Sequence, residues 1–449
     1  MALPATLDGQ KFGTSLFPNV GSSFMSDNEN APMAPQLETS QNPLRPSGSK
    51  EHPTLLFDGP RRPLFWLLLR NFLLTIITAG IYRFWAKTKV RKFFWQRTKL
   101  LNEPLEYLGT GGELFVGFLI AIVILVPFGA TYSLLQFLMV GMDGALPIII
   151  QVAYYTIIGF LIHVAIYRMR RYRLTRTAWR GVRFGLDGSA FRYAVISFLY
   201  TALSIVTLSL ANPWLRVATM KYFVRNARFG GTSLSLSARA MWLFPRWLAV
   251  GIPNALALGI FVILNWQVFA RIIALNDKAA QGVQVGTEMS VLMAQIVWWP
   301  FAFIAASFLV GIWYSVVEFR YLIGSLTLGK VALKSSLTAA FVYRVYIVFW
   351  VAFFAVLALI GSAIMITEVR FEAAGTSVGL QITLMISAVA AYFLYGAART
   401  LFVDVTLLKR ACATLEIENT DELDNVIQSS ADLPGHGEGL ADALDVGGF

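Results

Sequence analysis

Charged residues are scarce in this chain. Of its 449 residues, Asp, Glu, Lys and Arg make up 14%, whereas soluble domains carry about 25%. Hydrophobic residues make up 56%, and the mean hydropathy is +0.61. This balance excludes an ordinary cytosolic enzyme, a nucleic-acid-binding domain and a disordered scaffold. It indicates a helical membrane protein with several spans.

Cysteine and histidine are also scarce. The single cysteine, Cys412, excludes an intrachain disulfide and a cysteine-based metal cluster. His52, His163 and His436 are far apart in the sequence, which leaves little basis for a histidine metal site. The sequence also contains no Walker motif, nucleophile elbow or zinc motif. We therefore expect no cofactor, no metal and no enzymatic activity.

The two ends of the chain differ in composition from its body. Residues 1–50 are rich in Pro, Ser, Asn and Gly and lack a sustained apolar run, so we expect a disordered cytosolic arm without a secretory signal. Residues 416–449 contain nine acidic residues and no Lys or Arg, which predicts an acidic disordered tail. Alternatively, this tail binds a partner or folds back on basic loops as a self-inhibitory segment.

Six apolar segments are long enough to cross a membrane, for which a helix needs about 20 residues. They form three hairpins whose short connectors are poor in basic residues. The opposite ends of the hairpins carry dense Lys and Arg clusters, which mark the cytoplasmic side and place both termini inside. The expected spans are residues 114–140, 145–167, 247–270, 289–317, 345–367 and 379–404.

Two further hydrophobic stretches, residues 64–81 and 191–211, fit this scheme less easily. Each approaches the length of a span, yet basic residues flank it on both sides. A full crossing would place one basic cluster per stretch outside. We favour a re-entrant or interfacial helix for each, with breaks at Gly80 and at Asn212-Pro213. The alternative is two ordinary spans, which gives eight in all.

The chain repeats a pattern of residue types at an offset of about 129 residues, which relates residues 57–99 to 186–228. Lys92-Phe93-Phe94, for example, matches Lys221-Tyr222-Phe223. Several basic-aromatic helix ends lead into short segments of β character with glycine, such as residues 105–109 and 179–185. We expect these segments to form hairpins in a small cytosolic β layer under the helices. Unrelated ordered loops are the alternative.

A dense, ordered set of residues lies between Phe57 and Gly109. It comprises Phe57-x-Gly59, Asn71-x-Leu73-Leu74-Thr75, Thr78-x-Gly80-Ile81-Tyr82, Trp85-Ala86-Lys87, Arg91, Phe93, Thr98, Leu100 and Leu105-Glu106-Tyr107-x-Gly109. This set resembles the signature of the YjgN family of bacterial inner-membrane proteins, a family of unknown function. With the layout of the spans, the resemblance covers roughly residues 55–415. It implies a multi-pass protein of the bacterial inner membrane and brings no catalytic residues.

Polar residues within the apolar segments are candidates for binding. Arg70 and Asn71 lie in the first apolar helix, where a charge is costly to insert. Arg70 either holds an anionic headgroup or substrate, or extends to the cytoplasmic headgroups beside Arg61 and Arg62. His163 lies near the inner end of a span, where we expect a hydrogen bond between helices. A proton relay from His163 to Asp404 is a weaker alternative.

Basic clusters interleaved with aromatic residues are typical of helices at the level of lipid headgroups. Their rings lie in the interface while the cations meet anionic lipid. RNA binding would use the same residue types, but spans interrupt the clusters every few dozen residues, so we expect no nucleic acid. The candidates for ligand or lipid contact are Arg70, Asn71, His163, Lys87, Arg91, Lys92, Arg171, Arg180, Arg216 and Lys221.

These observations support two functional hypotheses. In the first, a non-enzymatic inner-membrane protein binds anionic lipid at its cytosolic face and translocates a lipid or small solute. In the second, a structural or assembly factor recruits partners through its β layer and tails. A cavity that reaches the bilayer midplane beside Arg70, Asn71 or His163 would favour transport. The expected fold is an all-α polytopic membrane protein with six transmembrane helices in three hairpins, two further hydrophobic helices and short cytosolic β segments.

Overall fold

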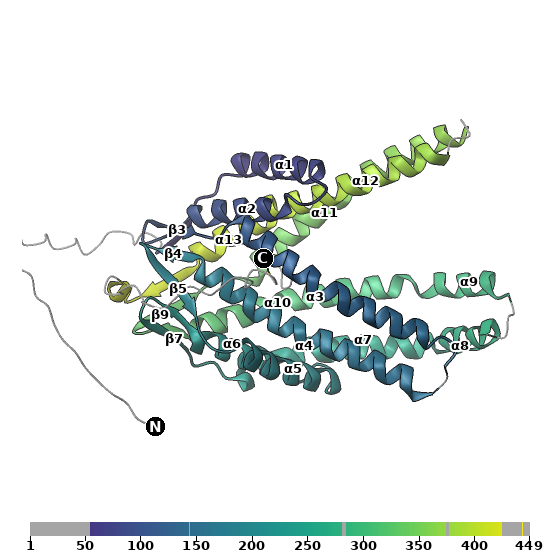
Figure 1. The fold of residues 1–449 in the computed structure, drawn as a ribbon, viewed down its shortest axis with the longest axis horizontal. Helices are drawn as coiled ribbons and strands as arrows, with labels where there is room; N and C mark the ends of the chain where they lie inside the picture. Colours follow the sequence, from purple (N-terminus) through teal and green to yellow (C-terminus); the bar gives the residue numbers. More distant parts are fainter. Residues whose placement is uncertain (1–53, 143, 281–283, 374–376, 424–441, 443–449) are drawn as a thin grey trace, which may run out of the picture. The chain divides into compact units, whose positions relative to one another are not determined.

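The computed structural model describes residues 54–142, 144–280, 284–373, 377–423 and 442. In residues 54–423, long helices extend from a layer of short strands (Figure 1). The α-helices are α1 (Arg61–Ile77), α2 (Arg83–Arg97), α3 (Gly111–Leu138), α4 (Ala145–Thr175), α5 (Ala190–Val206), α6 (Asn212–Asn226), α7 (Ala240–Leu264), α8 (Trp266–Ala280), α9 (Gly286–Ile296), α10 (Trp298–Gly324), α11 (Ala339–Ala373), α12 (Ser377–Ala398) and α13 (Val405–Ala413). A π-helical turn, η1 (Arg399–Asp404), joins α12 to α13, and a 3₁₀ helix, η2 (Thr420–Leu423), follows the last strand.

Six helical segments are long and apolar enough to cross a membrane. They are Gly111–Leu138, Ala145–Thr175, Ala240–Leu264, Gly286–Gly324, Ala339–Ser362 and Met385–Ala413. Each overlaps one of the expected spans, so the structure confirms six helices with the length and composition that a span requires. The helix α4 has 31 residues, or about 46 Å at about 1.5 Å per residue, against a hydrocarbon core of about 30 Å. Its arginine-rich last turns therefore extend beyond the hydrocarbon.

The two remaining hydrophobic stretches form short helices that turn back. The helix α1 has 17 residues, and the chain then reverses direction tightly and returns as α2, which packs along α1. In this reversal Ala79 and Gly80 have φ of 49° and 91°. The pair α5 and α6 repeats this arrangement, with Leu208 and Ser209 at φ of 49° and 70°. The bounds of α5 and α6 each lie 129 residues after those of α1 and α2.

The second reversal is not at the expected break. We expected the chain to turn at Asn212-Pro213, but α5 ends at Val206 and Pro213 lies in the first turn of α6. Proline is well tolerated there, because its missing N–H would have no helical partner and its φ suits a helix. Here proline marks the start of a helix, and residues with left-handed backbone make the turn.

Ten strands pair in chain order as one antiparallel sheet. They are β1 (Leu55–Phe57), β2 (Thr98–Leu100), β3 (Glu103–Tyr107), β4 (Thr177–Trp179), β5 (Val182–Leu186), β6 (Ala227–Phe229), β7 (Thr232–Leu236), β8 (Leu326–Leu328), β9 (Val331–Ser335) and β10 (Leu415–Glu418). The expected β hairpins are thus confirmed. At Arg180-Gly181 both residues have positive φ, 50° and 75°, as the tight type I′ turn between two strands requires.

Side chains from most of the strands share one core. Trp179, Phe229, Val331 and Leu423 are buried together, and side chains of β2, β3, β5, β8 and β10 pack against them. The sheet therefore curves around this core. The strand β10 pairs with β9, so the ordered sheet extends into the segment for which the composition predicts disorder from residue 416. Main-chain pairing, which composition does not report, orders these residues.

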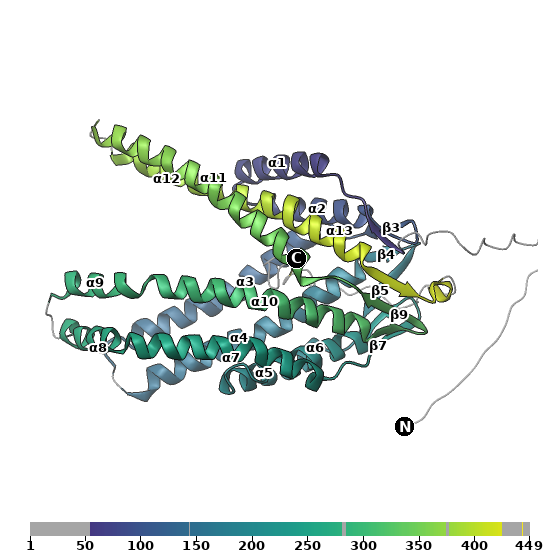
Figure 2. The same cartoon turned by 180° about the vertical axis from the view of Figure 1, so that it is seen from behind.

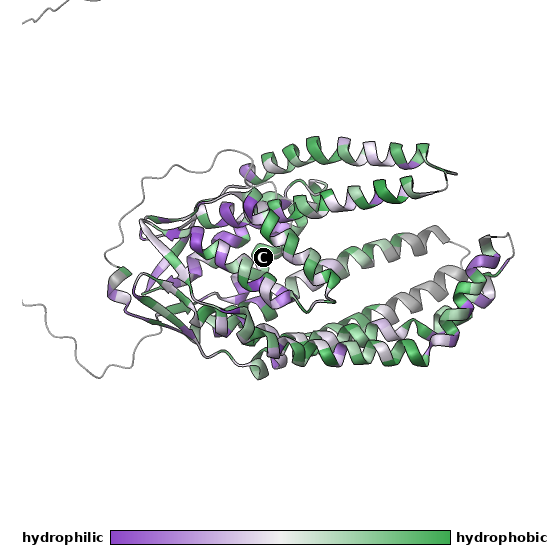
Figure 3. Ribbon diagram, turned by 90° about the horizontal axis from the view of Figure 1, so that it is seen from below, coloured by the Kyte–Doolittle hydropathy of each residue, from purple (hydrophilic) through white to green (hydrophobic). Residues whose placement is uncertain are grey.

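The basic clusters lie beside the sheet because of how helices connect to strands. The helices α2, α4, α6, α10 and α13 each run within two residues into β2, β4, β6, β8 and β10. Figure 2 shows this connection from behind for α10 and α13. In Figure 3, hydrophilic residues gather at the strand end, while the helices are mostly apolar away from it, apart from a few polar turns at one far tip. One end of residues 54–423 is thus polar and basic, and the other is a set of apolar helical hairpins.

Candidate anion site and apolar cavity

A buried ion-pair cluster joins α2, α4 and Asp442. Arg91 binds the Asp442 carboxylate through two hydrogen bonds. Its Nη2 donates to Oδ1 at 2.6 Å, and its Nη1 donates to Oδ2. Arg173 Nε donates to Oδ1 at 2.8 Å. Lys87 donates from Nζ to the main-chain oxygen of Asp442, and the same Nζ lies 4.0 Å from Oδ1. The side chain of Asp442 is fully buried, so three cations surround one dehydrated carboxylate.

The charges of this cluster stabilise one another. Burial alone would raise the pKa of Asp442, but hydrogen bonding and charge from Arg91, with the charges of Lys87 and Arg173, outweigh it and lower the pKa. Burial would likewise lower the pKa of Arg91, yet Asp442 raises it. Both groups are therefore ionised at neutral pH. This bidentate contact is the geometry in which a guanidinium group binds a carboxylate or a phosphate most strongly.

A second set of contacts fixes the arginines in place. Arg91 and Lys87 lie one turn apart on α2 and share a face. Arg91 Nη1 donates to Tyr107 Oη of β3 at 3.2 Å, and burial is the main cause of the raised pKa of Tyr107. The end of α4 is held to α3 by Arg176 and Glu113, whose atoms Nη2 and Oε1 are 3.0 Å apart. The anion site is thus built on elements that are fixed independently of Asp442.

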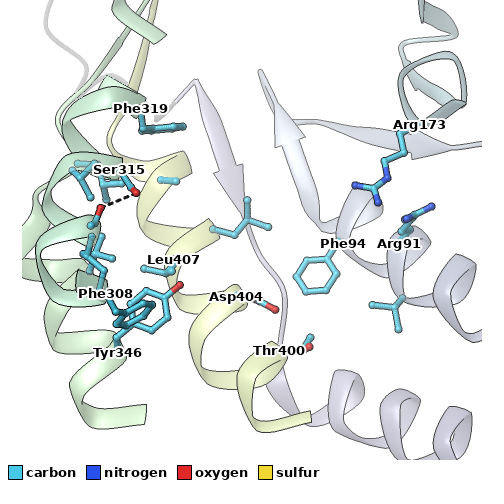
Figure 4. A pocket seen from close by; sticks show the side chains of 18 of the residues that line it. Arg91, Phe94, Arg173, Phe308, Ser315, Phe319, Tyr346, Thr400, Asp404 and Leu407 are labelled. Carbon is cyan, nitrogen blue, oxygen red and sulfur yellow. Dashed lines mark hydrogen bonds between the residues drawn. The ribbon is translucent and has the colours of Figure 1, made fainter. Parts of the chain in front are cut away.

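An apolar cavity of about 740 Å³ lies beside the arginines. Arg91 and Arg173 line one part of it, and Asp404 lines another (Figure 4). The negative charge of Asp404 is paired with Arg399, whose Nε lies 3.7 Å from Asp404 Oδ1. Most of the wall is aliphatic or aromatic, and it comes from α2, α10, the β9–α11 connector, α11 and α13: Val90, Phe94, Trp95, Phe308, Ile312, Val316, Phe319, Leu337, Val342, Tyr346, Leu407 and Leu408. The volume falls within the range of about 300–1,000 Å³ that is usual for small-molecule sites.

Comparison with known proteins decides the family. The family model described as "Bacterial protein of unknown function (DUF898)" matches residues 52–443, which include every residue of the anion site. The chain belongs to the DUF898 family. The resemblance to YjgN proteins, which rested on residues 57–109, is also confirmed. With its six apolar helices, this DUF898 protein is a multi-pass membrane protein.

Two curated relatives carry the name "Inner membrane protein YjgN". The protein from Salmonella typhimurium is 32% identical over 158 residues, which are 34% of this chain and 36% of that protein. The protein from Escherichia coli O157:H7 is 28% identical over 136 residues, or 30% of this chain and 31% of that protein. The matches thus span about a third of the length of these relatives. No solved structure matches the chain.

Of the ten candidates from the sequence, the structure of this DUF898 protein brings two together at the anion site, Lys87 and Arg91. Lys92 and Lys221 are exposed on α2 and α6. Arg171 donates to the carbonyl of Gly188, and Arg180 lies over the Trp179 ring at 4.5 Å. Arg216 Nε lies 3.6 Å from Glu318 Oε1. These contacts place the other cations around the sheet end at separate positions.

The candidates within the apolar helices also lie apart from the cavity. Arg70 is exposed on α1, whereas Asn71 is buried, donates from Nδ2 to Ala86 O at 3.4 Å and leaves its Oδ1 without a described partner. His163 Nδ1 lies 2.8 Å from Ser197 Oγ of α5, so its hydrogen bond goes to a neighbouring helix and not to Asp404. None of the residues that line the cavity in the described structure is Arg70, Asn71 or His163.

Sequence reasoning did not find Arg173 or the role of Asp442. Arg173 is one of seven arginines between residues 168 and 183, and its spacing does not show which arginine faces α2. Asp442 is one of nine acidic residues of the tail, 351 positions from Arg91. The only sequence signal was the opposite charge of the tail and the basic loops, which suggested that the tail folds back.

Proposed function

We propose that this DUF898 protein is a non-enzymatic inner-membrane protein that binds an anionic amphiphile in the cavity beside Arg91 and Arg173. One observation carries the proposal: a carboxylate, that of Asp442, is held in this position by two guanidinium groups and shielded from water. A carboxylate or phosphate headgroup would use the same nitrogens. The adjoining apolar wall would accept an alkyl chain, because burial of a chain from water is favourable.

The orientation that we propose places this site at the inner leaflet. The basic ends of the helices adjoin the sheet, and a Lys and Arg excess marks the cytoplasmic side. The sheet and both termini are then cytoplasmic. The helix α1 spans about 25 Å, less than the hydrocarbon core of about 30 Å, and the chain returns through α2. We therefore assign α1–α2 and α5–α6 as re-entrant hairpins that enter and leave on the cytoplasmic side.

The cavity supports binding more directly than transport. A path through the bilayer would need polar residues near the midplane, and Arg70, Asn71 and His163 are not among the residues that line the cavity. The lining comes from α2, the end of α4, the β9–α11 connector, the start of α11, η1, α13 and α10, where it reaches Phe308 near the middle of the helix. An amphiphile held there would have its headgroup at Arg91 and Arg173 and its chain among the helices.

Native mass spectrometry of the full chain in a neutral detergent tests this proposal. The probes are lysophosphatidic acid and a monoacylglycerol of the same chain length, which differ in the phosphate. We expect selective binding of lysophosphatidic acid. Arg173→Gln should weaken that binding at least about tenfold, since a hydrogen bond to a charged group contributes about 1.5–3 kcal/mol. The matched control Arg225→Gln removes an exposed arginine of α6 and should leave the binding unchanged.

A second variant distinguishes loss of binding from loss of folding. Arg91→Gln combined with Asp442→Asn removes both charges of the most deeply buried pair, so Arg91 is not left buried opposite a neutral side chain. Lys87 and Arg173 also lose the Asp442 carboxylate, but their side chains are partly exposed. We expect it to retain the thermal stability of the wild type and to lose selectivity for lysophosphatidic acid. Equal binding of both probes by the wild type, or equal effects of Arg173→Gln and Arg225→Gln, would overturn the proposal. The recruitment hypothesis would then be the better account of the family.

A further inference from the structure

A second apolar groove lies on the other side of η1. Its volume is about 510 Å³, and its walls are α11 on one side and α12 with η1 and α13 on the other. The turn η1 separates the two hollows, since Thr400 and Asp404 line the first cavity and Phe402 lines the groove. π-Helical turns of this kind are rare in proteins, and those that do occur are often found at functional sites.

Cations gather at the end of the groove that adjoins the sheet. Arg61 donates to Leu401 O at 3.2 Å and to Thr406 Oγ1 at 3.0 Å, which holds its guanidinium at the groove. Arg344 is an exposed lining residue, and no salt bridge joins it to any described residue. Arg410 lies over the ring of Phe341, itself a lining residue, at 5.4 Å. No acidic side chain is among the described residues that line this groove.

The rest of the groove is an apolar track along a candidate membrane span. Val345, Val348, Ala352 and Val356 follow one another at helical spacing on α11, so they form one stripe. Val348 is 68% exposed, and Leu394 on the α12 side is 39% exposed. This stripe belongs to the span Ala339–Ser362, where exposed apolar side chains face lipid. The groove thus runs from a cationic end into the level of the acyl chains.

We propose that this groove is a docking site for one anionic glycerophospholipid of the adjacent leaflet. Its phosphate lies between Arg344, Arg61 and Arg410, and an acyl chain follows the α11 stripe. The charge complementarity carries the assignment, because basic residues near an anionic lipid surface favour binding by a factor of about five each. The inference does not depend on the cavity ligand, since the two sites share none of their described lining residues.

The experiment is a lipid titration of the full chain by native mass spectrometry. Phosphatidylglycerol and phosphatidylcholine are the probes, and glycerol phosphate serves as a headgroup without chains. We expect tight binding of one phosphatidylglycerol. Arg344→Gln should weaken it about fivefold, and Arg344→Gln with Arg410→Gln about twenty-fivefold. The control Arg239→Gln removes an exposed arginine elsewhere and should have no effect.

A further variant tests the apolar track separately. Ala352→Trp fills the middle of the groove and should reduce phosphatidylglycerol binding while Arg344 remains. Equal losses from Arg344→Gln and Arg239→Gln, or binding of glycerol phosphate as strong as that of the lipid, would overturn the inference. The variants of Arg91 and Arg173 lie outside the groove. A failure of the proposed cavity ligand and a failure of the lipid groove would therefore be seen separately.

Discussion

At the scale of single residues, the contact between Asp442 and Arg91 is the feature with the clearest energetic consequence. Asp442→Asn keeps the size of the side chain but removes its charge, which leaves Arg91 buried with weaker hydrogen bonds. We expect a loss of about 2 kcal/mol in the free energy of unfolding. Thermal or detergent-induced unfolding of the purified protein would measure it.

The same contact predicts a dependence on pH. The folded protein lowers the pKa of Asp442 below its ordinary value of 3.8. Its stabilisation is therefore fully present above the ordinary value and is lost as pH falls through the lower folded value. The stability difference between wild type and Asp442→Asn should be constant from about pH 7 to 5 and shrink below about pH 4. A difference that disappears at pH 6 would argue against an ionised, buried Asp442.

Trp179 is the residue on which the curved sheet depends most. Its ring is 1% exposed, packs at 5.9 Å from the ring of Phe229 and donates from Nε1 to Leu100 O at 3.2 Å. Trp179→Ala should cost about 3–5 kcal/mol in unfolding free energy, because it opens a large hole in a packed core. Trp66→Ala is the matched control, since that ring is 58% exposed on α1. A similar loss in both variants would contradict the assigned core.

At the scale of elements, length and flanking charge together separate spans from returning hairpins. The six spans were predictable because their apolar runs exceed the bilayer thickness and only one end of each hairpin is basic. The stretches 64–81 and 191–211 were ambiguous, since helices of 17 residues are close to the limit. Their reversals depend on left-handed backbone at residues such as Leu208, for which side-chain type gives little signal.

Labelling of single cysteines tests the returning hairpins. In a Cys412→Ser background, we expect Leu208→Cys at the α5–α6 turn to resist an impermeant maleimide added to intact cells. Gly144→Cys, in the connector between α3 and α4, should react, because the single crossing by α3 places that connector on the other side. If α5 crossed the membrane fully, Leu208→Cys would react from outside as well.

At the scale of the whole molecule, the fold brings together residues that the sequence keeps far apart. Lys87 and Arg91 were predictable as basic residues of a headgroup-level helix. Arg173, Asp442 and the apolar wall from α10, α11 and α13 come from segments as distant as 351 positions. Neither composition nor periodicity reports which helices become neighbours. The cavity, unlike the spans, therefore needed the tertiary structure.

The central claim is that Asp442 occupies the position of an anionic ligand. The most direct measurement is the affinity of the full chain for lysophosphatidic acid in wild type and in Asp442→Asn, compared at neutral pH. With the competing charge removed, we expect the affinity to rise about tenfold, since about 1.4 kcal/mol of competition corresponds to a factor of ten. An unchanged affinity would show that lipid and carboxylate do not share Arg91 and Arg173, and would contradict the claim.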